Sequence, residues 1–204
     1  MSLWIEKCGF LTGGLNMWWK VVLIVLGILA ICSGVFWIFI RGWDKEQPSK
    51  SEVLQPASGE PVGKALIVYH PGATGYTEEV AYAIGEGLQS MNWEVLLDRA
   101  NKTTVADLTS YDLLCVGSPT YVGTPRPPIM AYIERCAGLK GKESAVFATG
   151  SVNPDESNKK MKARLEKRGS KVIESLGVLV KQKGPEANNL AKEFGKKLAY
   201  NLKP

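Results

Sequence analysis

Hydrophobic and polar positions divide the chain into three stretches of different character. Residues 21–40 form an apolar run in which Ser33 is the only polar side chain. Residues 41–63 are polar, with three prolines and scattered Ser, Glu and Lys. From residue 64 onward, short β-branched runs alternate with segments whose apolar residues repeat every three to four positions. The pattern predicts an apolar helix, a flexible linker and one folded domain.

The apolar run is long enough to cross a membrane. Its 20 residues, at about 1.5 Å each, match a hydrocarbon core of about 30 Å. Aromatic and basic residues stand at both ends, as expected at the two membrane interfaces. They are Trp18, Trp19 and Lys20 at one end and Trp37, Arg41 and Trp43 at the other. We therefore predict a short tail at 1–20, a single-pass transmembrane helix at 21–40 and a linker at 41–63.

Two processed forms compete with this anchor. A cleaved signal peptide has a shorter apolar core followed by small residues, whereas residues 35–40 remain apolar. A lipoprotein-type cut before Cys32 would put the bulky Ile31 where a small residue normally stands. Three basic residues flank the C-terminal side of the run and two flank its N-terminal side. This slight bias favours a cytoplasmic C-terminal domain.

The remaining residues, 64–204, have the pattern of an α/β domain. Five strands are predicted, at residues 64–70, 93–99, 112–118, 144–150 and 172–180. Apolar residues between and after them share helical faces. These are Val80, Ile84, Leu88 and Met91, then Ile129, Ile133 and Cys136, then Met161 and Leu165 in a helix at 158–167, and finally Leu190, Phe194 and Leu198. Such alternation predicts a doubly wound five-stranded parallel sheet of order 2-1-3-4-5.

Composition and charge narrow the function classes. The net charge of +5 and isoelectric point near 8.9 are too modest for a nucleic-acid binder. Four scattered cysteines without a CxxC pair, and one histidine, predict neither a metal site nor a disulfide framework. We interpret His70 as structural, because it ends a strand just before Pro71. The basic stretch 159–171 is either a solvated helix face or a surface for anionic lipid.

The loop of residues 70–77 leaves the first predicted strand and enters a helix. Its small residues let the backbone close around an anion, and a helix N-terminus offers free N–H groups and a positive dipole end. Thr74 and Thr77 add hydroxyl donors. The loop has neither the GxxxxGK[ST] pattern of nucleoside triphosphatases nor the GxGxxG pattern of dinucleotide-binding folds. Its chemistry predicts a phosphate site.

In this loop the chain resembles a flavodoxin, whose first loop reads approximately S/T-x-T-G-N-T and binds the phosphate of FMN. Thr74, Gly75 and Thr77 match, whereas Gly72 replaces the first hydroxyl residue and Tyr76 replaces the asparagine. We expect the ring of Tyr76 to point outward. The resemblance implies cofactor contacts from Gly72, Ala73, Thr74, Gly75, Tyr76 and Thr77.

Two further loops carry the same resemblance, which covers the whole domain. Residues 117–125 (GSPTYVGTP) are similar to the GSPTY-x-G-TP segment of many flavodoxin-like reductases, the more specific match. Residues 148–153 resemble the family's other ring-binding loop. The resemblance implies contacts to the FMN ring from Pro119, Thr120, Tyr121, Val122 and Gly123, and from Thr149, Gly150 and Ser151. Tyr121 offers a flat face for stacking.

The sequence therefore predicts a membrane-tethered, FMN-binding flavodoxin-like protein that transfers electrons. Its expected partners are the lipid bilayer and either a redox protein or a quinone. An FMN-dependent oxidoreductase of quinone or porphyrinogen type and a non-enzymatic carrier both fit, and neither needs a catalytic side chain, because the flavin performs the chemistry. Gly72 and Tyr76 motivate an alternative, a flavin-free module that acts as a membrane-anchored interaction or regulatory domain.

Overall fold

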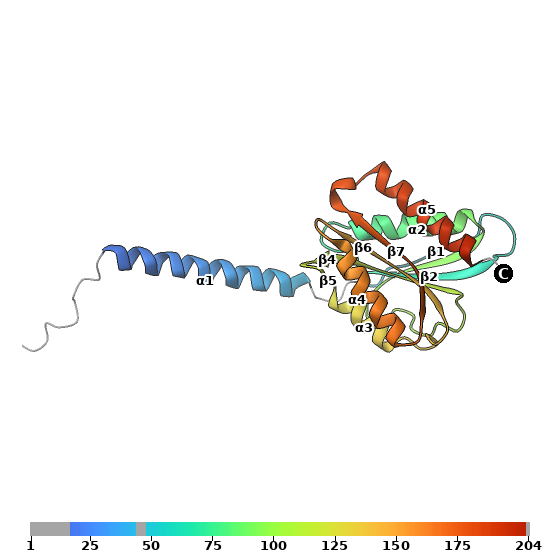
Figure 1. The fold of residues 1–204 in the computed structure, drawn as a ribbon, viewed down its shortest axis with the longest axis horizontal. Helices are drawn as coiled ribbons and strands as arrows, with labels where there is room; N and C mark the ends of the chain where they lie inside the picture. Colours follow the sequence, from blue (N-terminus) through green and yellow to red (C-terminus); the bar gives the residue numbers. More distant parts are fainter. Residues whose placement is uncertain (1–16, 44–47, 203–204) are drawn as a thin grey trace, which may run out of the picture. The chain divides into compact units, whose positions relative to one another are not determined.

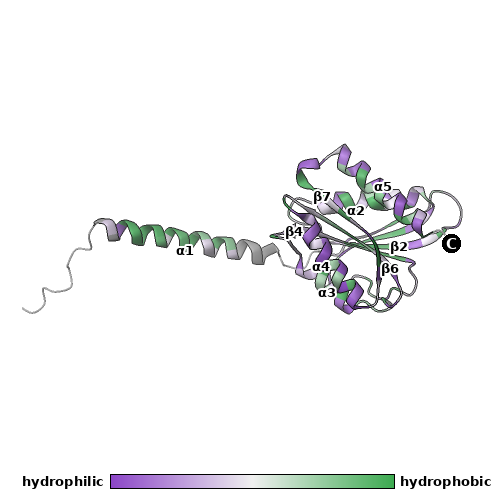
Figure 2. Ribbon diagram, in the orientation of Figure 1, coloured by the Kyte–Doolittle hydropathy of each residue, from purple (hydrophilic) through white to green (hydrophobic). Residues whose placement is uncertain are grey.

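The computed structural model describes residues 17–43 and 48–202, and the chain divides after Trp43 into two units. The first contains α1 (Met17–Trp43), a 27-residue helix that is hydrophobic along most of its length (Figures 1 and 2). Its stretch Lys20–Trp37 is long and apolar enough to cross a membrane, a test that a signal sequence also passes. Residues 1–16 of the predicted tail, and the side chains of Trp19, Arg41 and Trp43, lie outside the described residues.

The second unit is a three-layer α/β domain built on one sheet (Figure 1). Five strands run parallel: β2 (Gly63–Tyr69), β3 (Trp93–Arg99), β4 (Leu113–Tyr121), β6 (Glu143–Gly150) and β7 (Lys171–Leu179). They lie in the order β3-β2-β4-β6-β7, which is 2-1-3-4-5 among the parallel strands. Helices α2 (Tyr76–Ser90) and α5 (Pro185–Asn201) cover one face, and α3 (Pro127–Arg135) and α4 (Pro154–Lys167) cover the other. The prediction of a doubly wound α/β fold is confirmed.

Two further strands make the sheet seven-stranded and correct the predicted count of five. β1 (Ser51–Leu54) pairs antiparallel with β3, and β5 (Thr124–Pro125) pairs antiparallel with β4. β1 forms inside the segment 41–63 that its composition assigned to a linker, of which residues 44–47 are not described. The edge of β3 presents unpaired backbone N–H and C=O groups, so a segment with little strand pattern of its own can pair there.

The central strands separate two hydrophobic cores. In β2, Ala65, Ile67 and Tyr69 belong to the core beneath α2 and α5, while Leu66 and Val68 belong to the core beneath α3 and α4. All five are fully buried. A strand buried on both faces reads as a continuous apolar run, which is why its sequence predicted it so clearly.

The helices differ from prediction in two details. α4 begins at Pro154, four positions before the predicted helix. In α5, Leu190 is 43% exposed, and the buried face is completed by Ala191 instead. Small residues suit this face because α5 lies very close to α2: a Cβ on Gly195 would stand 2.2 Å from the carbonyl oxygen of Ile84.

Candidate functional site

The carboxyl ends of β2, β4 and β6 meet at one edge of the sheet, because these strands are parallel neighbours. Each is followed by one of the three loops predicted to bind a flavin. Thr77 Oγ1 lies 2.7 Å from Thr149 Oγ1, which joins the first loop to the third. The N–H of Ala73 donates to the hydroxyl of Tyr121 at 3.3 Å, which joins the first loop to the second. The three loops therefore form a single candidate site.

The first loop turns sharply between β2 and α2. Gly72 and Gly75 both have φ near +72°, a left-handed conformation that glycine adopts without strain. The buried His70 accepts a hydrogen bond on Nδ1 from the N–H of Gly72 at 3.0 Å, which orients the start of the loop. Gly75 leads directly into α2, whose first-turn N–H groups have no partners within the helix. These donors, with the exposed Thr74 beside them, suit an anion.

Tyr76 lies differently from the prediction. Its ring is 2% exposed and packs into the core beneath α2 and α5, instead of pointing outward. Its hydroxyl donates to the carbonyl oxygen of Leu179 at 3.4 Å, and burial raises the pKa of the phenol. The N–H of Tyr76 donates to Thr74 Oγ1 at 3.4 Å. Tyr76 therefore contributes its backbone to the site and not its ring.

Glu78 places a negative charge on the first turn of α2, where it could compete with a bound anion. Its carboxylate pairs with Lys50 at 2.7 Å and with Arg99 at 2.6 Å. Burial alone would raise the pKa of Glu78, but the hydrogen bonds from these two cations outweigh burial and lower the pKa. With its charge balanced in this way, Glu78 leaves the helix N-terminus attractive to a phosphate.

The second loop is a tight hairpin between β4 and β5. Its two central residues, Val122 and Gly123, have φ of +50° and +67°, as in a type I′ turn. The Val122 side chain at the tip of this turn is fully exposed. The guanidinium of the buried Arg126 lies 5.0 Å from the ring centroid of Tyr121. Sequence reasoning missed Arg126, although a single charge within an apolar, proline-rich stretch was a usable signal.

A buried hydroxyl without a partner lies between the second and third loops. Thr120 is 9% exposed, and its Oγ1 has no hydrogen-bond partner in the described part of the chain. Gly150 approaches it closely, since a Cβ there would stand 3.0 Å from the Thr120 side chain. An unsatisfied buried hydroxyl costs about 1–3 kcal/mol unless a ligand or an ordered water supplies the missing bond. Thr120 is therefore a candidate hydrogen-bonding partner for a polar ligand group or a water molecule.

The predicted site residues fall into three sets. Those buried together at the edge are Thr77, Pro119, Thr120, Thr149 and the backbone of Gly150. Those at the partly or fully exposed rim are Gly72, Ala73, Thr74, Gly75, Tyr121, Gly123 and Ser151. The ring of Tyr76 points into the core, and the side chain of Val122 is fully exposed at the tip of the second loop. Among residues 17–43 and 48–202 there is no cluster of three or more potential metal ligands.

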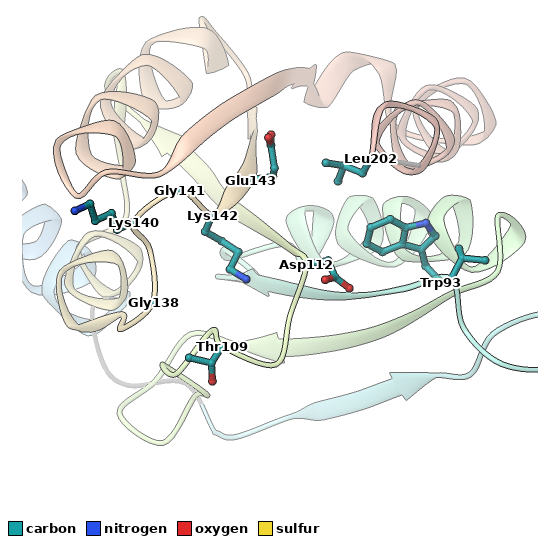
Figure 3. Close-up of a pocket in the computed structure, with 10 residues that line it drawn as sticks. Trp93, Thr109, Asp112, Gly138, Lys140, Gly141, Lys142, Glu143 and Leu202 are labelled. Carbon is teal, nitrogen blue, oxygen red and sulfur yellow. The ribbon is translucent and has the colours of Figure 1, made fainter. Parts of the chain in front are cut away.

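A separate cavity of about 600 Å³ lies at the opposite edge of the sheet (Figure 3). Trp93, Asp112 and Glu143 line it at the amino ends of β3, β4 and β6. The length of the strands separates it from the three loops. It is therefore not part of the candidate site.

Comparisons with known proteins agree with this fold. A family model described as a flavodoxin domain matches residues 66–181. Flavodoxin 2 from Bacillus cereus is 27% identical with a TM-score of 0.59 over 68% of this chain and 99% of its own. An archaeal flavodoxin, 23% identical with a TM-score of 0.58 over 69% of this chain and 99% of its own, shares the fold.

One curated relative adds an enzyme to the comparison. A protein named NAD(P)H dehydrogenase (quinone), from Sinorhizobium fredii, is 28% identical over 111 residues. The match covers 45% of this chain and 55% of the relative, so the chain spans only about half of that protein's length.

Proposed function

The chain belongs to the flavodoxin domain family, and from this membership we propose that its domain binds FMN at the carboxyl edge and works as a membrane-tethered electron carrier or reductase. A flavin-type electron-transfer or reductase role follows from the family and its relatives. The contact between Thr77 and Thr149 supports FMN binding at this edge above all, because it brings loops far apart in sequence to one place.

The residues at this edge fit the two ends of FMN. The first-turn N–H groups of α2 that lack partners within the helix, the glycine-rich backbone before it and the Thr74 hydroxyl suit the phosphate. The unpartnered hydroxyl of Thr120 suits the polar edge of the ring, and Tyr121 suits its face. Bound FMN supplies one- and two-electron chemistry. The protein's residues hold the ring, orient it and limit the access of water.

The segments that precede the domain in the chain, and the name of one relative, support a location and a redox partner for it. The apolar Lys20–Trp37 stretch supports a membrane anchor at residues 21–40, after a tail at 1–20. The segment 41–63 then connects it to a domain of residues 64–204, with β1 as an additional strand from that segment. We place the domain on the cytoplasmic side, where flavin is made. The name of the quinone dehydrogenase relative supports a quinone as the redox partner, with a partner protein as the alternative.

Titration of the full-length protein in detergent with FMN, followed by flavin absorbance and fluorescence, tests the proposal. Saturable binding of one FMN per chain is expected. Thr74→Asp puts a carboxylate beside the phosphate, and two like charges about 4 Å apart repel by about 4 kcal/mol at an effective dielectric constant of about 20. The affinity should therefore fall more than about a hundredfold.

Thr109→Asp is the matched control, because Thr109 is also exposed but lies at the opposite edge beside the Figure 3 cavity. Equal effects of the two substitutions would place the phosphate elsewhere. Failure of the folded wild-type protein to bind FMN would refute the proposal. That result would leave the second candidate, a flavin-free interaction or regulatory module, which the buried ring of Tyr76 favours because it brings no donor to the phosphate loop.

A further inference from the structure

A positively charged groove opens on the side of the domain that α3 and α4 cover. Its volume is about 440 Å³, and its walls come from β5, α3 and α4. Three of the lining side chains are cations and three are apolar, and no acidic residue lines it. The cations are Lys160, Arg164 and Lys167, and the apolar residues are Pro125, Met130 and Ala163. This lining suits a ligand that combines negative charge with a flat apolar body.

Two of the three cations are free of ion pairs. Neither Lys160 nor Lys167 pairs with an acid among residues 17–43 and 48–202, whereas Arg164 is paired with a glutamate of α3. Elsewhere on α4 the positive charge is balanced, because Lys159 and Lys162 each have a glutamate one turn away. The unbalanced charge on this helix is therefore concentrated in the groove.

The groove lies next to the proposed ring-binding loop. Two of its lining residues form β5, which pairs with the end of β4 that carries Thr120 and Tyr121. α4 begins at the carboxyl edge, directly after the third loop. With a rise of about 1.5 Å per residue, Lys160 stands about 9 Å along the helix from Pro154, and Lys167 stands about 10 Å further on. Lys160 is thus the cation nearer to the flavin edge.

We propose that this groove binds the 2′-phosphoadenosine end of NADPH, with the pyrophosphate beside Lys160 and the 2′-phosphate beside Lys167. The inference rests on the proposed flavin function, because the nicotinamide end would then extend past β5 toward the ring-binding loop. The volume lies in the range of small-molecule sites, which favours a nucleotide over a flat protein surface. Met130, Pro125 and Ala163 offer the base an apolar wall.

Binding of NADP⁺ and NAD⁺ to the full-length protein, measured by calorimetry with and without FMN, tests this assignment. NADP⁺ should bind at least about tenfold more tightly than NAD⁺, because one charge-assisted bond to phosphate contributes about that factor. Lys167→Gln should reduce NADP⁺ affinity to that of NAD⁺ and leave NAD⁺ unchanged. Lys160→Gln should weaken both. Lys162→Gln, the same change outside the groove, should weaken neither.

Three results would overturn the proposal. They are equal affinities for the two nucleotides, an effect of Lys162→Gln as large as that of Lys167→Gln, or binding of phosphatidylglycerol vesicles through Lys160 and Lys167 without binding of NADP⁺. The FMN titration separates this proposal from the function on which it rests. If FMN binds but the preference for NADP⁺ is absent, only the groove assignment fails. If FMN does not bind, the proposed function fails, and the titrations without FMN still decide what the groove accepts.

Discussion

Val122 is the residue whose backbone fits its side chain least well. It sits at the tip of the β4–β5 hairpin with φ of +50°, a left-handed conformation that is rare for a β-branched residue. Its side chain is 101% exposed, so no packing compensates within the domain. Asparagine adopts this conformation readily, and Asn-Gly is the preferred pair in a type I′ turn. Val122→Asn should therefore relieve strain without removing a contact.

The size of the gain follows from the backbone alone. The left-handed region costs an ordinary L-residue about 1–2 kcal/mol, and asparagine avoids most of that cost. Val122→Asn should raise the free energy of unfolding by about 1 kcal/mol. Val122→Gly should gain less, because glycine loses up to about 1 kcal/mol more backbone entropy on folding. For a domain of about 150–250 residues, 1 kcal/mol corresponds to a rise in Tm of about 2–4 °C.

The assay is urea and thermal unfolding of the unit Asp44–Pro204, followed by circular dichroism. Val152→Asn is the matched control, because Val152 is 77% exposed on the neighbouring loop but does not have a positive φ. It should change stability by less than about 0.5 kcal/mol. An unchanged or lower stability of Val122→Asn, or an equal gain from Val152→Asn, would refute the strain argument.

Two further predictions concern the start of α2. Thr77→Val should lower the free energy of unfolding by about 1–2 kcal/mol, because it leaves the Thr149 hydroxyl buried without its partner. A double-mutant cycle with Thr149→Val should show strong coupling between the two residues. Additive effects would contradict the contact. The lowered pKa of Glu78 stabilises the fold above the ordinary value of 4.5, and that stability is lost as the pH falls through the folded pKa. Glu78→Gln should therefore destabilise the domain at pH 7, and its stability should approach that of the wild type as the pH falls below the lowered pKa of Glu78. A stability gap that stays constant in acid denaturation curves would argue against the ion pairs.

The parallel core of the fold could be predicted because buried strands and helices have recognisable hydrophobic patterns in the local sequence. Residues 64–70 are apolar without interruption because β2 packs on both faces, and the face of α2 with Val80, Ile84 and Leu88 repeats with the helical period. The sequence of β1 has no such hydrophobic pattern. Its residues are mostly exposed, and it is a strand because the edge of β3 offers backbone partners, which no local pattern reveals.

The meeting of the three candidate loops was predictable to a similar extent. Glycines and hydroxyl residues after three strands indicated which loops to consider, and the order of those strands brings the loops together. The directions of individual side chains were harder to predict from the sequence. Tyr76 was expected to face outward, but on the first turn of α2 its ring fits into the core and reaches the carbonyl oxygen of Leu179, more than 100 positions away.

By itself, the sequence determined the apolar helix, the alternation of strands and helices and the three loops rich in glycine and hydroxyl residues, because hydrophobic periodicity and turn chemistry are properties of short segments. Only the tertiary structure decided that a linker segment becomes β1 and that Tyr76 turns inward. It also decided that the Thr120 hydroxyl has no partner among the described residues and that Lys160 and Lys167 share a groove. Each of these depends on a partner from a distant segment, and the packing of the sheet and helices, not the local pattern, selects that partner.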